Sequence, residues 1–224
     1  VRTSTHQTCQ ILTTELCYLH TFMKYLIFDF DGVLGNTLEP WNAVIKEVDG
    51  LSDDEIAARN DKIFSKSAHT RDFTFSKEEL NKMNEWVSHR GSLVAQKGFD
   101  LFDGFIDEIK KIPDTKMAVV SSGSFHYIKP KLENCGLAFS HILTFEDHHS
   151  KEEKVESICN DLAISLDQVY FFTDSISDVL ELERILDKNK IYGCSWGYQG
   201  HTKLATVLDE EHIFDYRLIV WGIF

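Results

Sequence analysis

The sequence has few positive charges for its size, and this shortage limits the partners that the protein can bind. Its 224 residues include 23 Lys and Arg but 36 Asp and Glu, which gives a formal net charge of -13 at pH 7. Because affinity for nucleic acid comes mostly from Lys and Arg on phosphate, this balance argues against a nucleic-acid-binding protein. It does not exclude a small phosphorylated metabolite, since a bound divalent cation can offset local carboxylates.

Paired cysteines and long apolar runs are also missing. The five cysteines are scattered, odd in number and without a Cys-x-x-Cys spacing. This pattern favours reduced thiols in a cytoplasmic protein over a disulfide framework or a zinc site. No apolar run approaches the roughly 20 residues of a membrane span, so we expect no membrane segment. With 43% hydrophobic residues, the chain can still bury one core and carry an insertion.

The first 22 residues carry no recognisable motif. They are rich in Thr, and Gln10 and Glu15 interrupt any apolar run, so the segment is a poor signal peptide. We predict a disordered or weakly helical extension, or the product of an upstream start. Everything interpretable begins at Met23.

From Met23 onward, short apolar runs alternate with longer segments of helical periodicity. The predicted strands are 24–30, 116–121, 141–145, 168–173 and 190–194, and the predicted helices between the later ones are 128–134, 151–162 and 177–186. This alternation of near-continuous apolar strands with helices predicts an α/β fold with a Rossmann-like, doubly wound parallel sheet. In such sheets ligands bind beyond the carboxyl ends of the strands.

One connection is too long for this pattern. A crossover between parallel strands needs about a dozen residues, yet Ser121 lies 90 positions after Asp31 (121 − 31). The excess contains two capping boxes, SDDE at 52–55 and SKEE at 76–79, which predict helix starts. We therefore predict a helical cap at 39–97, inserted after the first strand of a core formed by 23–38 and 98–224.

Acidic side chains follow two of the predicted strands. Asp29 and Asp31 lie in LIFDFDGVLGN, while Asp174 and Asp178 lie in YFFTDSISDV. Converging carboxylates would repel one another without a cation, and Mg²⁺ prefers oxygen ligands. The four acids are therefore candidate metal ligands, although Asp178 can instead complement a helix N-terminus.

Two further segments complete the candidate site. In KMAVVSSGS, a strand runs out into Ser121, Ser122 and Gly123, whose hydroxyl and amide groups suit a phosphate, although the same pattern is typical of a plain turn. In HHSKEEKVESI, Ser150 is predicted to cap a helix that begins at Lys151, which places Lys151 near the strand ends. Lys154 lies almost one turn further along, and we expect its side chain to be solvated.

In this order, the Asp-Phe-Asp-Gly-Val segment, the strand-end serine, the lysine and Asp-Ser-x-x-Asp resemble the four motifs of the haloacid dehalogenase superfamily of phosphohydrolases. The resemblance extends from Met23 to about Val220. It implies that Asp29 is the nucleophile and Asp31 the general acid/base. It also implies that Ser121 binds phosphate, that Lys151 balances charge and that Asp174 binds Mg²⁺.

The resemblance also implies a role for Asp178, in the metal shell or as a partner of Lys151. The step of 23 residues from Lys151 to Asp174 (174 − 151) is similar to that in phosphoserine-phosphatase-like members, which favours Lys151 over Lys154. Two positions depart from the family pattern. Thr173 replaces the usual Gly, and the Lys-Pro pair of many capped members is missing.

These residues predict a Mg²⁺-dependent phosphatase that forms an aspartyl-phosphate. The open alternatives are a phosphotransferase or phosphomutase acting on a sugar phosphate, and a non-catalytic binding protein. In the cap, 69–75 and Arg90-Gly91 are candidates for substrate recognition, or else a solvated loop around core aromatics. SWGYQG, at 195–200, resembles family loops at the active-site rim, or is only a turn. The sequence does not predict the oligomeric state.

Overall fold

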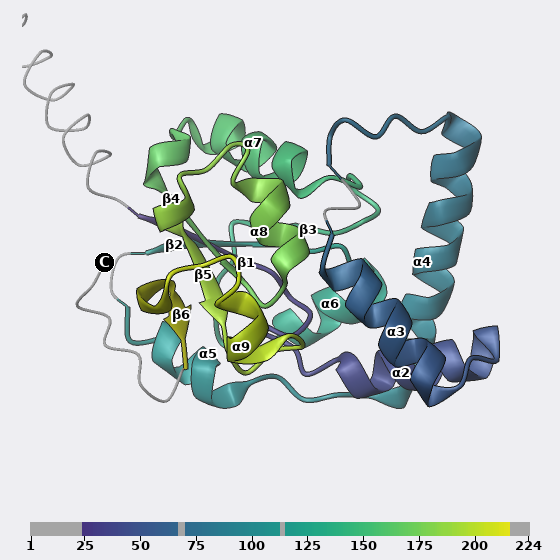
Figure 1. Cartoon of the computed structure of the whole chain (residues 1–224). Helices are drawn as coiled ribbons and strands as arrows, with labels where there is room; N and C mark the ends of the chain where they lie inside the picture. The colour runs from purple at the N-terminus through teal and green to yellow at the C-terminus, as the bar shows by residue number, and fades with distance from the viewer. Residues whose placement is uncertain (1–23, 67–69, 113–114, 216–224) are drawn as a thin grey trace, which may run out of the picture.

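The computed structural model describes residues 24–66, 70–112 and 115–215 (Figure 1). The predicted extension at 1–22 lies outside these residues. The described chain forms one parallel sheet with the strand order β3-β2-β1-β4-β5-β6. The strands are β1 (Tyr25–Phe28), β2 (Lys116–Val120), β3 (His141–Leu143), β4 (Val169–Thr173), β5 (Ile191–Cys194) and β6 (Ile213–Phe214). This confirms the predicted Rossmann-like fold; the short β6 was not predicted.

Helices connect the strands and cover both faces of the sheet. They are α2 (Leu38–Asp49), α3 (Asp53–Phe64), α4 (Lys77–Lys97), α5 (Asp103–Ile109), α6 (Phe125–Leu132), α7 (Lys151–Leu162), α8 (Ile176–Leu182) and α9 (Gly200–Leu204). The predicted bounds of α7 are confirmed. α6 begins three residues earlier than expected, because Ser124 caps it through the amide of His126.

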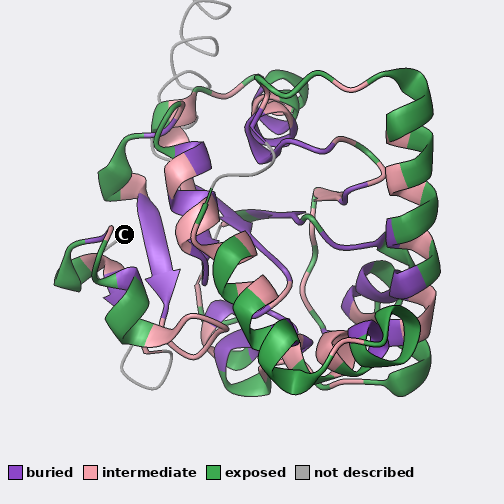
Figure 2. Cartoon of the chain, turned by 45° about the vertical axis from the view of Figure 1, so that its right-hand side comes forward, coloured by how far each residue is buried: buried purple, intermediate pink, exposed green. Residues whose placement is uncertain are grey.

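Alternating side chains of the strands build two cores, one on each face of the sheet. In β1, Leu26 and Phe28 pack in the core that includes residues of α5 and α6. Tyr25 and Ile27 pack in the opposite core, with residues of α7, α8 and α9. Figure 2 shows the strands buried between helices whose outer faces are exposed. A sheet buried on both faces explains why its strands read as continuous apolar runs.

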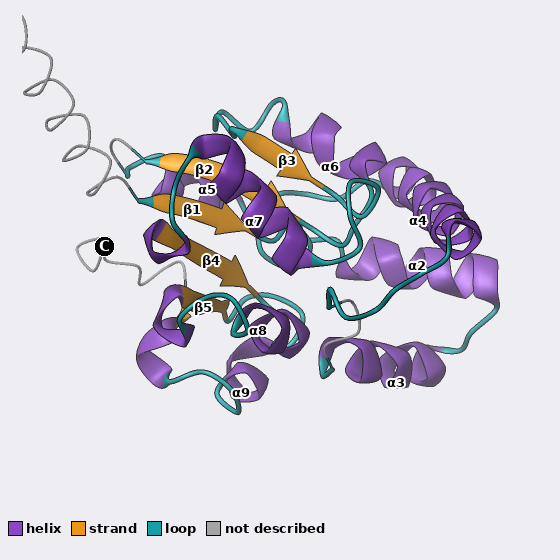
Figure 3. Ribbon diagram, turned by 90° about the horizontal axis from the view of Figure 1, so that it is seen from above, coloured by secondary structure: helices purple, strands orange, loops and turns teal. Residues whose placement is uncertain are grey.

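The helices α2, α3 and α4 follow β1 and lie beyond the carboxyl ends of the strands (Figure 3). Both predicted capping boxes form: the Ser52 and Ser76 hydroxyls accept from the amides of Glu55 and Glu79, whose carboxylates accept in return. The helical insertion is thus positioned over the edge of the sheet where ligands of this fold class bind. The division into 23–38, 39–97 and 98–224 as separate units stays a prediction.

Within the described residues, no helix combines the length and apolar character needed to cross a bilayer. Cys135, Cys159 and Cys194 are buried free thiols, whereas Cys9 and Cys17 lie outside the described chain.

Candidate active site

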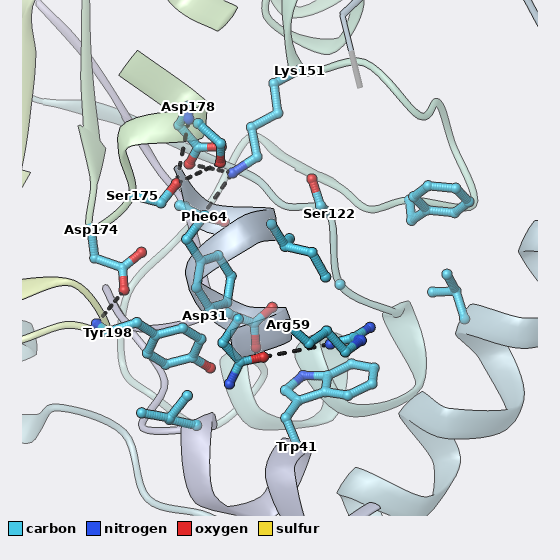
Figure 4. A pocket seen from close by; sticks show the side chains of 18 of the residues that line it. Asp31, Trp41, Arg59, Phe64, Ser122, Lys151, Asp174, Ser175, Asp178 and Tyr198 are labelled. Carbon is cyan, nitrogen blue, oxygen red and sulfur yellow. Dashed lines mark hydrogen bonds and ion pairs between the residues drawn. The ribbon is translucent and has the colours of Figure 1, made fainter. Parts of the chain in front are cut away.

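A cavity of about 720 Å³ lies between the strand ends and the α2–α4 insertion. Its walls bring together acids that are up to 152 positions apart in the sequence (181 − 29). Figure 4 shows Lys151 and Asp178 at one end of the cavity, with Trp41 and Arg59 at the other. The predicted residues on the wall are Asp29, Asp31, Ser122, Gly123, Lys151, Asp174 and Asp178.

The turn after β1 positions Asp29 and Asp31. The amide of Asp29 still donates to Phe172 O at 2.9 Å, so this residue continues the sheet. The chain then turns at Gly32, which has a φ of +75°. A Cβ atom on Gly32 would overlap the carboxylate of Asp174. Glycine therefore permits the close approach of the first and fourth strand ends.

Lys151 forms the centre of a buried ion-pair cluster. Its Nζ lies 2.8 Å from Asp29 Oδ2 and 2.6 Å from Asp178 Oδ2, and the residue is 1% exposed. Thr173 Oγ1 also donates to Asp178 Oδ2, at 2.6 Å. The threonine that replaces the usual glycine therefore binds the partner of the lysine. Asp178 was predicted either to support a metal ion or to pair with Lys151, and in this structure it pairs with Lys151.

The start of α7 holds Lys151 in place. Ser150 caps this helix through the amide of Glu153, as predicted. Glu181, on α8, accepts from the Lys151 amide at 2.7 Å and from Ser150 Oγ at 3.1 Å. A carboxylate at a helix N-terminus is favourable because the free amides there carry partial positive charge. No sequence motif indicated a role for Glu181, since its partner Lys151 lies 30 positions away.

Negative charge is in excess at this end of the cavity. Burial raises the pKa of Asp29, against the opposing effect of Lys151, and the nearby Asp178 and Asp174 raise it further. Burial likewise raises the pKa of Asp174 to about 7, although the Tyr198 amide lowers it. Burial acts to raise the pKa of Asp178, but Lys151, Thr173 and Asp29 together lower it. A cation near Asp29 and Asp174 would relieve this excess.

The acids do not form a complete metal cage by themselves. Among the described residues, no three Asp, Glu, His or Cys side chains are close enough together to hold a metal ion. Each of the four predicted carboxylates already accepts from a protein group: Asp29 and Asp178 from Lys151, Asp31 from Thr37, and Asp174 from the Tyr198 amide. The four-carboxylate metal set therefore stays a prediction. Mg²⁺ commonly binds to one or two carboxylates plus substrate phosphate and water, and the excess negative charge at Asp29 and Asp174 suits such an ion.

Asp31 is held by hydroxyl groups instead of an ammonium group. Thr37 Oγ1 donates to Asp31 Oδ1 at 2.5 Å, and Tyr127 OH donates to Oδ2 at 2.6 Å. Thr37 also shares a hydrogen bond with the hydroxyl of Tyr198. Burial raises the pKa of Asp31 and the hydroxyl donors lower it, with a net rise. Burial, and not repulsion among the converging carboxylates, is therefore the largest cause of the rise.

Thr37 and Tyr127 were not predicted from the sequence, and Tyr198 was named only as part of the 195–200 segment. Thr37 lies only six residues after Asp31 but belongs to none of the four motifs. The two tyrosines lie in segments far from Asp31 in the sequence. Tyr198 lies in SWGYQG, so the structure places this segment at the rim of the cavity. There the Tyr198 amide donates to Asp174 Oδ2 at 2.6 Å.

The Ser121–Gly123 segment is only partly available to a ligand. Ser121 is fully buried, and its Oγ accepts from the Gly123 amide at 2.9 Å and donates to Asp31 Oδ2 at 3.4 Å. It does not line the cavity, whereas Ser122 and Gly123 do. The Gly123 amide, which was expected to suit a phosphate, therefore already donates to Ser121 Oγ in this structure. A ligand meets Ser122 first.

The prediction for Lys154 is wrong. This side chain is 1% exposed, and its Nζ donates to Ser121 O at 2.6 Å and Thr144 O at 3.3 Å. Burial, together with the charge of Lys151, lowers its pKa to about 7. Lys154 thus ties the ends of β2 and β3 together from the same helix that carries Lys151.

The recognition candidates of the cap lie elsewhere. Arg90 is buried, forms an ion pair with Asp49 and lies over the ring of Trp86, 4.1 Å from its centroid. It does not line the main cavity. In the 69–75 segment, Arg71 instead pairs with glutamates of α7, at 2.8 Å from Glu156. Neither candidate reaches the acids.

Together, the fold and the site define a doubly wound α/β protein with an acidic, lysine-centred cavity under a helical insertion. A family model described as haloacid dehalogenase-like hydrolase matches residues 26–181. The chain belongs to this family. No curated protein matches the sequence significantly.

Solved structures of low sequence identity share the fold. A protein assigned as a haloacid dehalogenase-like hydrolase from Bacteroides fragilis has 18% identity and a TM-score of 0.63, with 88% of this chain and 100% of that chain covered. A predicted phosphoglycolate phosphatase from Haemophilus somnus has 19% identity and a TM-score of 0.57, with 86% and 94% covered. A predicted phosphatase from Clostridium acetobutylicum has 18% identity and a TM-score of 0.59, with 85% and 93% covered.

Proposed function

We propose that this chain is a Mg²⁺-dependent phosphatase that hydrolyses a small phosphorylated metabolite through an aspartyl-phosphate on Asp29. The observation that carries the proposal is the different setting of two neighbouring acids on one cavity wall. Asp29 lies against the ammonium of Lys151, while Asp31 accepts from Thr37 and Tyr127. One acid is thus placed beside positive charge and the other among hydroxyl groups that can exchange protons.

Asp29 supplies the nucleophile in this proposal. One of its carboxylate oxygens forms a bond to phosphorus as the bond to the leaving oxygen breaks. The Lys151 ammonium stabilises charge on the phosphoryl oxygens, which matters because such transfer depends mainly on positioning and electrostatics. Ser122 lies on the same wall and can donate to an oxygen of the group.

Asp31 moves the proton. Burial raises its pKa, which favours a protonated acid that can donate to the leaving oxygen. It then accepts a proton from the water that attacks phosphorus, and this second step breaks the bond to Asp29. General acid/base help of this kind is typically worth roughly 10²–10⁴-fold in rate.

Phosphatases of this family generally use a divalent metal, and the carboxylates of Asp29 and Asp174 fit such an ion. Both are buried, and the cavity holds more carboxylates than Lys151 can balance. A bound Mg²⁺ would supply further positive charge for the phosphoryl group. EDTA should therefore abolish phosphate release and added Mg²⁺ restore it, and turnover that survives thorough chelation would contradict the metal requirement.

The two acids can be tested separately with an acyl phosphate, whose leaving group needs no proton. Asp31→Asn should form the phosphoenzyme and then stall, so an acid-stable, hydroxylamine-labile phosphoprotein should accumulate. Asp29→Asn should form none. Label on serine or histidine, or turnover by Asp29→Asn, would contradict the assignment. Transfer of label to an added sugar instead of water would favour the phosphotransferase.

A further inference from the structure

Aromatic side chains surround the group that is proposed to protonate the leaving oxygen. Trp41 Nε1 donates to Tyr127 OH at 3.3 Å, and this hydroxyl donates to Asp31. On another side, the ring of Phe64 lies 5.3 Å from that of Tyr198, whose hydroxyl is bonded to the Asp31 partner Thr37. The leaving group of a substrate must therefore begin among rings.

The cavity continues from these rings as a mostly apolar space. At about 720 Å³, it is of the size that holds a drug-sized ligand and far exceeds the needs of a phosphate. Trp86 of α4 lies on its wall and is 39% exposed, although its indole is among the largest apolar groups of the chain. The remaining apolar lining is Leu38, Ile45, Ile63, Met83, Val87 and Phe145.

Arg59 lies on this wall without a carboxylate partner, and the exposed Lys66, also on the wall, has none among the described residues either. Among the described residues, Arg59 forms no ion pair, and its one hydrogen bond, to Asn60 Oδ1, is 3.5 Å long. Asp49, the acid that acts on it electrostatically, is paired with Arg90. Figure 4 places Arg59 beside Trp41, away from Lys151 and Asp178. A ligand that reaches this end gains if it carries an acceptor there.

We propose that the substrate is a phosphomonoester whose leaving group has a flat aromatic body, with a carboxylate or similar acceptor at its far end. The phosphate end of this substrate rests on the proposed function, whereas its aromatic body is inferred from Trp41, Phe64 and Trp86 on the cavity wall. Rings favour such a body because aromatic pairs gain beyond the area they bury. A short polyol phosphate would leave this wall uncovered.

Binding of non-hydrolysable phosphonates tests the ligand without requiring turnover. We compare 2-phenylethylphosphonate with ethylphosphonate by calorimetry on the full chain with Mg²⁺. Burying a group the size of a phenylalanine side chain is worth roughly one to two factors of ten in affinity, so the phenyl ligand should bind at least about tenfold more tightly. Equal affinities, or equally tight binding of 2-cyclohexylethylphosphonate, would overturn the aromatic assignment.

Substitutions on and off the cavity wall test which residues cause the preference for the phenyl ligand. Trp86→Ala should reduce the ratio of the two affinities toward one. Phe73→Ala is the matched control, because this exposed aromatic of the 70–75 loop does not line the main cavity. It should leave the ratio as it is. A para-carboxylate on the phenyl ligand should tighten binding, and Arg59→Met should remove that gain; no loss in Arg59→Met would overturn the acceptor at the far end.

Kinetics with the matching esters separate the two proposals. The phosphates of 2-phenylethanol and ethanol have similar alkoxide leaving groups, so a difference in kcat/KM reports binding and not intrinsic reactivity. If the phenyl phosphonate binds preferentially but neither ester is hydrolysed, the phosphatase function fails while the ligand class holds. If both esters are hydrolysed equally well, the function holds and the ligand class fails.

Discussion

Replacing Lys151 by Met tests the ion-pair cluster on which the proposed chemistry depends. Methionine keeps much of the length of the side chain and removes its charge. Asp29 Oδ2 and Asp178 Oδ2 then lose a partner at 2.8 and 2.6 Å, in a site where neither residue is more than 6% exposed. Two carboxylates would remain buried with no ammonium between them.

The expected loss of stability is large. Removing one partner of a buried ion pair costs about 3–5 kcal/mol, because it leaves an uncompensated charge. Since Lys151 serves two carboxylates, we expect a loss near the upper end, about 5 kcal/mol. This is a large part of the roughly 5–15 kcal/mol that stabilises a typical domain. Protonation of Asp29 limits the cost, since burial already raises the pKa of this group.

The loss should also depend on pH. Without Lys151, the pKa of Asp29 rises further above its unfolded value. A carboxyl with a raised pKa in the folded state contributes stability below its unfolded pKa, and this contribution is lost as pH rises through the folded pKa. The free energy of unfolding of Lys151→Met should therefore fall, relative to the native chain, as pH rises above about 4.

Urea unfolding of metal-free protein between pH 5 and 8 measures this effect. Adding Asp178→Asn to Lys151→Met should recover part of the loss, because only one buried charge then remains. Lys154→Met is the matched control from the same helix. It removes donors to carbonyl oxygens and not to carboxylates, so at pH values below the Lys154 pKa of about 7 it should lower stability without the pH-dependent loss. A cost below about 1 kcal/mol for Lys151→Met, typical of a surface pair, would refute the buried cluster.

Three further changes test neighbouring contacts. Tyr127→Phe removes a hydroxyl donor that lowers the pKa of Asp31. The part of the kcat/KM–pH profile that reports the titration of Asp31 should therefore move to higher pH. An unchanged profile would contradict the hydrogen bond between Tyr127 and Asp31. Gly197→Ala places a Cβ atom against Asp174 and 2.6 Å from a backbone oxygen, so the Mg²⁺ concentration for half-maximal activity should rise while far-ultraviolet dichroism stays native. Arg90→Met should lower stability by about 2 kcal/mol, which is less than the cost of breaking a fully buried pair because the partner Asp49 is partly exposed. A rise in KM without a loss of stability would instead indicate that Arg90 takes part in substrate recognition.

Local sequence was sufficient for much of the fold. The capping boxes at Ser52 and Ser76 and the serine before α7 were predicted, because each depends on contacts within three residues. The positions of Asp29 and Asp174 at strand ends followed in the same way, from apolar runs that stop at an acid. β6 was missed because two residues carry no periodic pattern.

The choice between the two lysines of α7 shows where sequence reasoning stops. Lys151 and Lys154 are almost one helical turn apart, and both are 1% exposed. The motif spacing selected Lys151, yet nothing local indicated that Lys154 would be buried. Its burial depends on the carbonyl groups of Ser121 and Thr144, which only the packed sheet brings to it.

The sequence by itself determined the kind of sheet, the edge at which a ligand binds and the acids placed there, because strand periodicity and motif order are properties of neighbouring residues. Tertiary structure decided what each acid contacts. In the folded chain Asp178 forms an ion pair with Lys151, and Asp31 accepts hydrogen bonds from Thr37 and Tyr127. Ser121 is buried and does not line the cavity. These outcomes depend on which groups from distant segments meet after water is excluded, and a short stretch of sequence does not contain that information.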